Sequence, residues 1–296
     1  MHPRLYGIFP PIPTTFDAAT GDVDSRAMAA NVRRWMTTSL AGVLALGSNG
    51  EAASLEEDES DRVVAAVRGE VPGDRVLLVG TGRESTRGTI AATRRAAALG
   101  ADAVLVRTPS YFKGQMTTEA LVAHFSAVAD ASTIPVLLYN LPGVTGLSRS
   151  LPVIERLAVH PNIPGMKETS ADLERLGVFA AVSPAVFVVL CGGAPVLHPA
   201  LMAGAVGAIL AVANILPAEC VALVDLVRAG RHADALAAQR RLTPIAQQVT
   251  SVHGIAGLKF ALDELGYQGG PVRAPLLPLG EKARADLARA LGAVGA

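Results

Sequence analysis

VLLVGTGRESTRGTIAATRRAAALGADAVLV, residues 76–106, contains a complete strand–helix–strand unit. The apolar runs at its two ends show no alternation of polar and apolar residues, which is typical of parallel strands buried on both faces. The segment between them, residues 85–99, has the composition of an amphipathic helix. Ser85 can cap the start of this helix, and Gly100 can end it. We therefore predict two parallel strands joined by a helix.

The same unit repeats along most of the chain, so that eight apolar runs alternate with eight helical patterns. The predicted strands are residues 7–10, 42–46, 76–79, 103–106, 135–139, 163–166, 186–190 and 207–210. The predicted helices are residues 24–38, 54–68, 85–99, 117–131, 150–159, 172–182, 194–203 and 217–229, with Thr117 and Ser150 as further caps. The count of eight, and the polar segments after the strands, favour an α/β fold, the (β/α)8 TIM barrel. An open doubly wound sheet produces the same alternation and is the alternative.

The strand pattern stops near residue 231, and the remaining chain predicts helices over residues 231–252, 257–265 and 281–291. We therefore expect residues 1–228 to form the catalytic barrel and residues 229–296 to form a small C-terminal helical region.

Composition excludes several classes of protein. Half of the 296 residues are apolar and 18% are charged, which indicates a globular protein with a large core. The formal net charge is zero, so no basic field favours nucleic acid or an anionic membrane as a partner. Cys191 and Cys220 are too few for a disulfide framework and are typical of buried thiols in a reducing compartment. With no secretory signal or membrane span visible, we expect a cytoplasmic protein.

Lys167 is one of only four lysines among 26 Lys and Arg residues. It ends an apolar run in Gly-Met-Lys-Glu-Thr, residues 165–169. Desolvation at the end of a buried strand favours the neutral amine, which can attack a ketone and form a Schiff base, whereas a guanidinium cannot. A lysine that extends its ammonium group to solvent is the alternative, and position alone favours it.

Other strand ends carry polar groups. Gly-Ser-Asn-Gly-Glu, residues 47–51, can present backbone N–H groups to an anion, or it can be an ordinary turn. Tyr139 could transfer protons or simply pack as an aromatic residue. Gly-Thr-Gly, residues 80–82, begins like a dinucleotide fingerprint, but Ser85 occupies the position of its third glycine. The six histidines show no spacing typical of a metal site, so no metal is predicted.

Three motifs together resemble the dihydrodipicolinate synthase / N-acetylneuraminate lyase family of pyruvate-dependent class I aldolases. They are residues 47–51, the Tyr-Asn-Leu-Pro of residues 139–142, and residues 165–169. The resemblance extends from Gly7 to the tail at residues 266–276. The first motif, the His-Pro-Asn-Ile of residues 160–163 and the tail are most similar to the branch of 4-hydroxy-2-oxoglutarate aldolases.

The resemblance implies a catalytic role for four residues. Lys167 would condense with the C2 ketone of a 2-oxo acid, and the covalent imine would make any further cofactor unnecessary. Tyr139 would exchange a proton with the C4 hydroxyl group of the substrate. Ser48 and Tyr111 would complete a proton relay, with Tyr111 reaching across an interface into the site of a neighbouring subunit. The protein would then be a homo-oligomer, a dimer or a homotetramer.

The resemblance also implies a binding site for pyruvate and an aldehyde. Backbone N–H groups at Ser48 and Asn49 would bind the pyruvyl carboxylate, and Thr169 and Gly192 would line the same pocket. The partners would be small 2-oxo acids, with no nucleic acid and no membrane.

One departure from the family pattern bears on the substrate. Val144 stands where synthases that bind aspartate semialdehyde have an arginine, and a valine cannot bind a carboxylate through two hydrogen bonds. We therefore expect cleavage of 4-hydroxy-2-oxoglutarate to pyruvate and glyoxylate. Arg107 could bind a distal carboxylate, but we expect it to form a salt bridge on the barrel exterior.

Other activities in the family remain as alternatives. They are those of a 2-keto-3-deoxy sugar acid aldolase, an N-acetylneuraminate lyase and a 4-hydroxy-tetrahydrodipicolinate synthase. A catalytically silent pyruvate-binding barrel is a further alternative, against which the presence of Lys167, Tyr139, Ser48 and Tyr111 argues.

Overall fold

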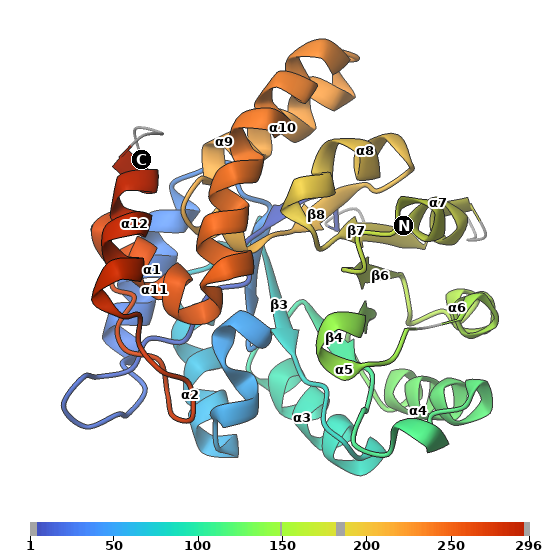
Figure 1. Ribbon diagram of the computed structural model, residues 1–296. Coiled ribbons are helices and arrows are strands. Elements are labelled where there is room, and N and C mark those ends of the chain that lie inside the picture. The colour runs from blue at the N-terminus through green and yellow to red at the C-terminus, as the bar shows by residue number, and fades with distance from the viewer. Residues whose placement is uncertain (1–4, 149, 182–186, 293–296) are drawn as a thin grey trace.

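The computed structural model describes residues 5–148, 150–181 and 187–292. At its centre, eight parallel strands are ordered β1-β8-β7-β6-β5-β4-β3-β2. A parallel bridge between Pro11 and Leu44 joins the chain after β1 to β2, which closes the sheet (Figure 1). This closure confirms the predicted TIM barrel and excludes the open sheet. The strands are β1 (Gly7–Phe9), β2 (Gly42–Ala45), β3 (Val76–Gly80), β4 (Ala103–Arg107), β5 (Val136–Asn140), β6 (Gly165–Glu168), β7 (Val188–Cys191) and β8 (Gly207–Ile209).

Helices surround the barrel, and their apolar faces cover its outer surface (Figure 1). They are α1 (Ser25–Met36), α2 (Glu57–Arg68), α3 (Thr86–Ala98), α4 (Thr118–Asp130), α6 (Leu151–Ala158), α7 (Leu173–Ala181), α8 (Leu197–Met202) and α9 (Pro217–Arg228). The short helix α5 (Pro142–Thr145) was not predicted. Residues 182 and 186, at the edges of a predicted helix and a predicted strand, lie outside the described residues.

The predicted helix caps are confirmed in two cases out of three. The hydroxyl groups of Ser85 and Thr117 each accept a hydrogen bond from the backbone N–H three residues later. Ser150 precedes α6 but makes no such bond. An N-cap hydroxyl usually accepts from the second or third helical N–H, and α6 has Pro152, which lacks an N–H, at the second position. Gly100, after α3, has the left-handed φ of 88° that favours glycine.

The strands alternate between two cores. In β5, Leu137 and Tyr139 belong to a cluster inside the barrel, whereas Val136 and Leu138 pack against the outer helices. The same parity holds in β4, where Leu105 points inward. Successive side chains of a strand point to opposite faces, so the last side chain of each strand points to the same face as the one two positions before it. This rule determines which side chains face the mouth of the barrel.

The C-terminal region consists of α10 (His232–Ala246), a π-helical segment (Gln247–Val252), α11 (Gly254–Glu264) and α12 (Glu281–Gly292). Helices α11 and α12 pack against each other, and the segment after α11 contacts α1 (Figure 1). Tyr267, after α11, stacks on Trp35 of α1 with 5.3 Å between ring centroids. Asn31 of α1 exchanges two hydrogen bonds with the backbone of Gln268. These contacts attach the region to the barrel, while the division at residue 228 stays a prediction.

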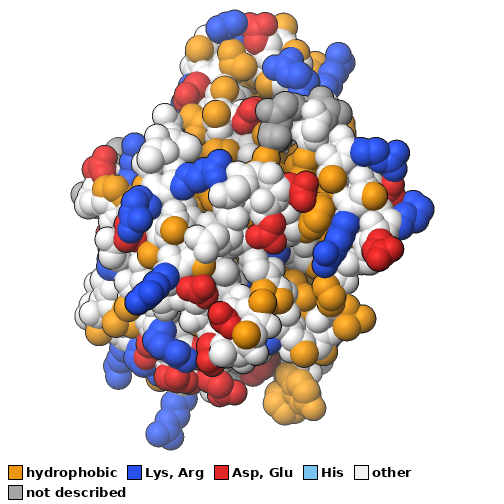
Figure 2. Space-filling view, turned by 90° about the vertical axis from the view of Figure 1, so that its left-hand side faces the viewer, with side chains coloured by type: hydrophobic (Ala, Val, Ile, Leu, Met, Phe, Trp, Pro, Cys, Tyr) orange, Lys and Arg blue, Asp and Glu red, His pale blue; other side chains and the backbone are white. Residues whose placement is uncertain are grey.

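The surface shows no large field of one charge on the face that Figure 2 presents, where acidic and basic side chains are interspersed. Among the described residues, no helix combines the length and the apolar character that a membrane crossing requires.

Arg273, in the tail after α11, clamps Glu59 of α2 with two hydrogen bonds of 2.6 and 2.8 Å. This contact holds the pKa of Glu59 below its ordinary value of 4.5. We expect Arg273→Met to lower the free energy of unfolding by about 3 kcal/mol at neutral pH, because it leaves a largely buried carboxylate unpaired. The measurement is the denaturant midpoint and slope of each protein.

A carboxyl group whose pKa is lowered in the folded state stabilises the fold above its unfolded pKa, and this contribution is lost as the pH falls through the folded value. The difference between wild type and Arg273→Met should therefore shrink below pH 4.5. Arg33→Met is the matched control, because Arg33 also binds a glutamate through two hydrogen bonds, but on the surface. Equal shifts in the two variants would contradict the anchoring role of Arg273.

Candidate active site

Lys167 and Tyr139 lie side by side at the carboxyl ends of β6 and β5, where the register pairs them directly. The Nζ of Lys167 donates a hydrogen bond of 3.3 Å to the hydroxyl oxygen of Tyr139. Both side chains are buried, with exposed fractions of 5% and 6%. Tyr139 belongs to the cluster inside the barrel, so Lys167, its neighbour in register, also faces the interior. The structure thus places an amine and a phenol together at the mouth of the barrel.

The residues that follow this pair hold the two strand ends together from the outer side. The side-chain amide of Asn140 donates a hydrogen bond of 2.7 Å to the carboxylate of Glu168. The other oxygen of Glu168 accepts the backbone N–H of Ser170 at 2.6 Å. The hydroxyl of Thr169 donates to the backbone carbonyl of Asn140 at 2.6 Å. Asn140 and Glu168 were not predicted to be functional, although both lie inside the quoted motifs.

Gly192 and Thr169 complete the wall beside the amine. A Cβ atom at position 192 would lie 2.1 Å from the Thr169 methyl group and 3.0 Å from Cε of Lys167, so only glycine fits there. The backbone N–H of Gly192 donates to the carbonyl of Glu168 at 2.7 Å. Gly192 and Thr169 therefore lie next to the side chain of Lys167.

The turn after β2 forms a short 3-10 helix, Ser48–Gly50. A buried ion pair anchors the residue that follows this helix. Glu51 follows with a left-handed φ of 52°. Its carboxylate pairs with Lys259 of α11 at 2.6 Å and accepts the backbone N–H of Arg273 at 2.8 Å. Burial lowers the pKa of Lys259, against the opposing effect of Glu51. This pair, which was not predicted, joins the C-terminal region to the turn.

A cavity of about 500 Å³ opens at this end of the barrel. Ser48 and Tyr139 line it together with Arg107 and Glu84, while Ile255, Pro275 and Leu276 contribute from the C-terminal region. Its volume suits a small-molecule ligand. Lys167 lies directly behind Tyr139, and Asn49 is half-buried beside Ser48. Of the predicted site residues, Ser48 and Tyr139 line this cavity. Lys167 contacts Tyr139, and Thr169 and Gly192 lie beside Lys167.

Tyr111 does not point into this cavity. Its side chain is 80% exposed, next to the 68% exposed Phe112. The loop that carries Tyr111 is held by its backbone: the N–H groups of Ser110 and Tyr111 both donate to the carboxylate of Glu84, at 2.8 and 2.9 Å. Within one chain, Tyr111 is therefore separate from Lys167 and Tyr139.

Arg107 was expected in a salt bridge on the barrel exterior, and this expectation is wrong in part. The salt bridge exists, with 2.6 Å between Nη1 and a carboxylate oxygen of Glu84. However, Arg107 is in register with Tyr139 and follows the inward-facing Leu105 by two positions, so it faces the mouth and lines the cavity.

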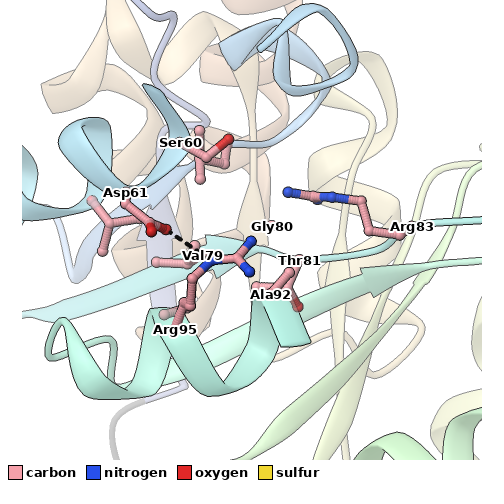
Figure 3. A pocket seen from close by; sticks show the side chains of 11 residues that line it. Ser60, Asp61, Val79, Gly80, Thr81, Arg83, Ala92 and Arg95 are labelled. Atoms are coloured by element: carbon pink, nitrogen blue, oxygen red, sulfur yellow. Dashed lines mark hydrogen bonds and ion pairs between the residues drawn. The ribbon is translucent and has the colours of Figure 1, made fainter. Parts of the chain in front are cut away.

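A second cavity lies between α2, α3 and β3 (Figure 3). Ser60, Asp61, Arg83 and Arg95 line it, and Arg95 bonds Asp61 at 3.2 Å. Its volume of about 10 Å³ holds a single water molecule, which is too little for a substrate.

Among the described residues, no group of three or more His, Cys, Asp or Glu side chains could hold a metal ion. Cys191, beside Glu168 in register, is buried, and burial raises the pKa of its thiol to about 11. It is therefore a poor nucleophile at neutral pH.

Comparison with known proteins agrees with this geometry. The model of the Dihydrodipicolinate synthetase family matches residues 4–294. A 4-hydroxy-tetrahydrodipicolinate synthase of Xanthomonas campestris is 38% identical over 93% of this chain and 90% of its own. A probable mitochondrial 4-hydroxy-2-oxoglutarate aldolase of Emericella nidulans is 36% identical over 96% of this chain and 93% of its own.

One solved structure is similar to this chain over nearly its whole length. A prophage protein of the dihydrodipicolinic acid synthase family from E. coli K12, solved in complex with pyruvate, has a TM-score of 0.91. It is 30% identical and is matched over 98% of this chain and 99% of its own. The chain therefore belongs to the dihydrodipicolinate synthetase family of pyruvate-dependent class I aldolases and lyases.

Proposed function

We propose that this protein cleaves 4-hydroxy-2-oxoglutarate to pyruvate and glyoxylate through an imine at Lys167. The observation that carries the proposal is the buried amine of Lys167, 3.3 Å from the hydroxyl of Tyr139. An amine in this setting can attack a ketone, and a phenol beside it can exchange protons with the adduct.

The reaction begins when Nζ of Lys167 attacks C2 of the substrate. The proton of the Tyr139 hydroxyl joins the leaving oxygen, which departs as water. This step forms a protonated imine and leaves Tyr139 as a phenolate. Tyr139 accepts the proton of the C4 hydroxyl group as the C3–C4 bond breaks. The electron pair of that bond moves toward the iminium nitrogen and gives an enamine, while C4 leaves as the aldehyde carbon of glyoxylate. Protonation of the enamine at C3, followed by hydrolysis, releases pyruvate and restores the amine.

The turn at Ser48 and Asn49 is proposed to bind the carboxylate next to the reacting ketone. A turn of successive backbone N–H groups attracts an anion without a cationic side chain. The buried pair of Glu51 and Lys259 supports this turn at its C-terminal end, and Thr14 bonds the carbonyl of Gly50 at 2.7 Å. A rigid turn binds the carboxylate at a lower entropic cost than a mobile one.

The choice of substrate rests on the loop after β5. Val144 lines the cavity with 71% of its surface exposed, so this loop offers an apolar side chain where an arginine would bind aspartate semialdehyde. The Emericella nidulans relative supports a 4-hydroxy-2-oxoglutarate aldolase. A 4-hydroxy-tetrahydrodipicolinate synthase is the second candidate, because relatives with that name, from Xanthomonas campestris and an Exiguobacterium species, are 38% and 34% identical.

A substrate panel tests the choice. We expect the highest kcat/KM for cleavage of 4-hydroxy-2-oxoglutarate, above the values for 2-keto-3-deoxy sugar acids and N-acetylneuraminate and for condensation of pyruvate with aspartate semialdehyde. A higher value for aspartate semialdehyde would establish the second candidate instead. Turnover of none of these substrates, with pyruvate still bound, would indicate a silent barrel.

Reduction with borohydride in the presence of pyruvate should add a pyruvyl group to the peptide that contains Lys167, because borohydride traps imines. Lys167→Arg should abolish both the adduct and turnover, since a guanidinium cannot form the imine. Lys282→Arg is the control, because Lys282 is 91% exposed in α12 and should tolerate the change. Peptide mass spectrometry locates the adduct, and an adduct on Lys113 or Lys259 would refute the assignment.

Tyr111 is proposed to act in the site of a neighbouring subunit of a homo-oligomer. Its ring is 80% exposed, and the backbone bond to Glu84 anchors the loop that carries it, which leaves the ring accessible to a second chain. Tyr111→Phe should reduce the rate by about 10²- to 10⁴-fold, the range for one proton-transfer group, while the Lys167 adduct still forms.

Mixing Tyr111→Phe with Lys167→Ala subunits tests the shared site. After dissociation and reassociation, some sites combine an intact Lys167 from one chain with an intact Tyr111 from the other. Activity should therefore return in the mixture but not in either variant treated alone. Native mass spectrometry verifies that subunits exchange. Verified exchange without recovered activity would place the role of Tyr111 within its own chain.

A further inference from the structure

We propose that Arg107, oriented by Glu84, binds a carboxylate at the end of the substrate that is remote from Lys167. This inference rests on the proposed function, in which the substrate is a 2-oxo acid with a second carboxylate. It assigns the group that recognises that carboxylate and makes the site selective for dicarboxylates.

The first support is the order of three side chains across adjacent strands. The register pairs Arg107 of β4 with Tyr139 of β5, and Tyr139 with Lys167 of β6. Residues in register on parallel strands point to the same face and are separated by about 4.8 Å per strand. Lys167, Tyr139 and Arg107 therefore form one row along the mouth of the barrel.

This row matches the order of atoms in the substrate. C2 bonds to Lys167, the C4 hydroxyl group contacts Tyr139, and the C5 carboxylate is one bond beyond C4. A chain that extends from Lys167 past Tyr139 next meets the strand that carries Arg107. The Arg107 side chain is long enough to bend toward that end of the chain.

The second support is that Arg107 is held in place. Its Nη1 bonds Glu84 at 2.6 Å, and Glu84 is itself fixed by the N–H groups of Ser110 and Tyr111. Burial alone would raise the pKa of Glu84, but these hydrogen bonds together lower it, so Glu84 stays charged. Gly82 packs against the stem of Arg107, where a Cβ atom would lie 2.7 Å from Cγ.

The third support is the remaining hydrogen-bonding capacity of Arg107. Its bonds to Glu84 and to the Thr108 carbonyl both use Nη1. Toward the described residues, Nε and Nη2 make no hydrogen bond, and this edge of a guanidinium binds a carboxylate through two parallel bonds. Of the described residues that line the cavity, Arg107 alone is a Lys or Arg. No other described cation of the cavity wall competes for the distal carboxylate.

Imine trapping tests this assignment without turnover. 2-Oxoglutarate carries the distal carboxylate but lacks the C4 hydroxyl group, and 2-oxopentanoate has the same chain length without that carboxylate. The concentration that gives half-maximal borohydride trapping on Lys167 is measured for both compounds and for pyruvate. We expect wild type to favour 2-oxoglutarate over 2-oxopentanoate by about 10- to 100-fold, the ratio expected for hydrogen bonds to a charged group.

Arg107→Met should remove this preference and leave the trapping of pyruvate unchanged. Arg107→Val is the second variant, because valine suits the end of a strand. Arg83→Met is the matched control: Arg83 is 25% exposed and pairs with Glu57, as Arg107 is 31% exposed and pairs with Glu84, but Arg83 lines the small cavity instead. This control should keep the preference.

Equal trapping of both compounds by wild type would overturn the proposal, and so would a preference that survives in Arg107→Met or Arg107→Val. Loss of pyruvate trapping in both variants would also overturn it, because the proposal gives Arg107 no part in holding pyruvate. Failure of the proposed function is a separate observation, namely no cleavage of 4-hydroxy-2-oxoglutarate by wild type. A dicarboxylate preference with another cleaved substrate would retain Arg107 and replace only that substrate.

Discussion

The parallel pairing of β5 with β6 sets Tyr139 opposite Lys167, and the chemistry proposed for the site depends on this register. Side chains alternate along a strand, so a slip of one residue would turn a side chain from the barrel interior toward the helices. The contact between Asn140 and Glu168, one position further along each strand, ties the same strands on the other face. A buried amide and a buried carboxylate that satisfy each other are costly to separate. The polar contact outside the barrel therefore stabilises the alignment of the reactive groups inside it.

A second constraint reaches the site from the opposite wall. The turn that ends at Glu51 combines a left-handed backbone with a carboxylate that is fully enclosed. Such a charge is tolerable only with a partner, and Lys259 and the backbone of Arg273 supply that partner. The C-terminal region thus contributes in two ways, because it neutralises Glu51 and because Ile255 and Leu276 form part of the cavity wall.

The sequence was sufficient to predict the eight strands, the closed barrel and the positions of Lys167 and Tyr139. Apolar runs mark the strands, and three motifs mark the strand ends. It was not sufficient for Arg107, because a strand buried on both faces lacks the alternation that would show which way its last side chain points. The pairing of Glu51 with Lys259 was also beyond prediction, since partners so far apart in sequence leave no local pattern. Ser150 does not act as a side-chain cap: Pro152 has no N–H, and the N–H of Val153 donates to the backbone carbonyl of Ser150 instead of its hydroxyl.

The long separation between Glu51 and Arg273 has a consequence for biosynthesis. The hydrogen bond between them joins residues 222 positions apart. Contacts of this kind form late, because the loop between the partners must close first. On the ribosome, the strands of the barrel emerge before the residues that neutralise Glu51 have been translated. The nascent chain therefore carries an incomplete turn until Lys259 and Arg273 have been synthesised, and the proposed carboxylate site cannot mature before then.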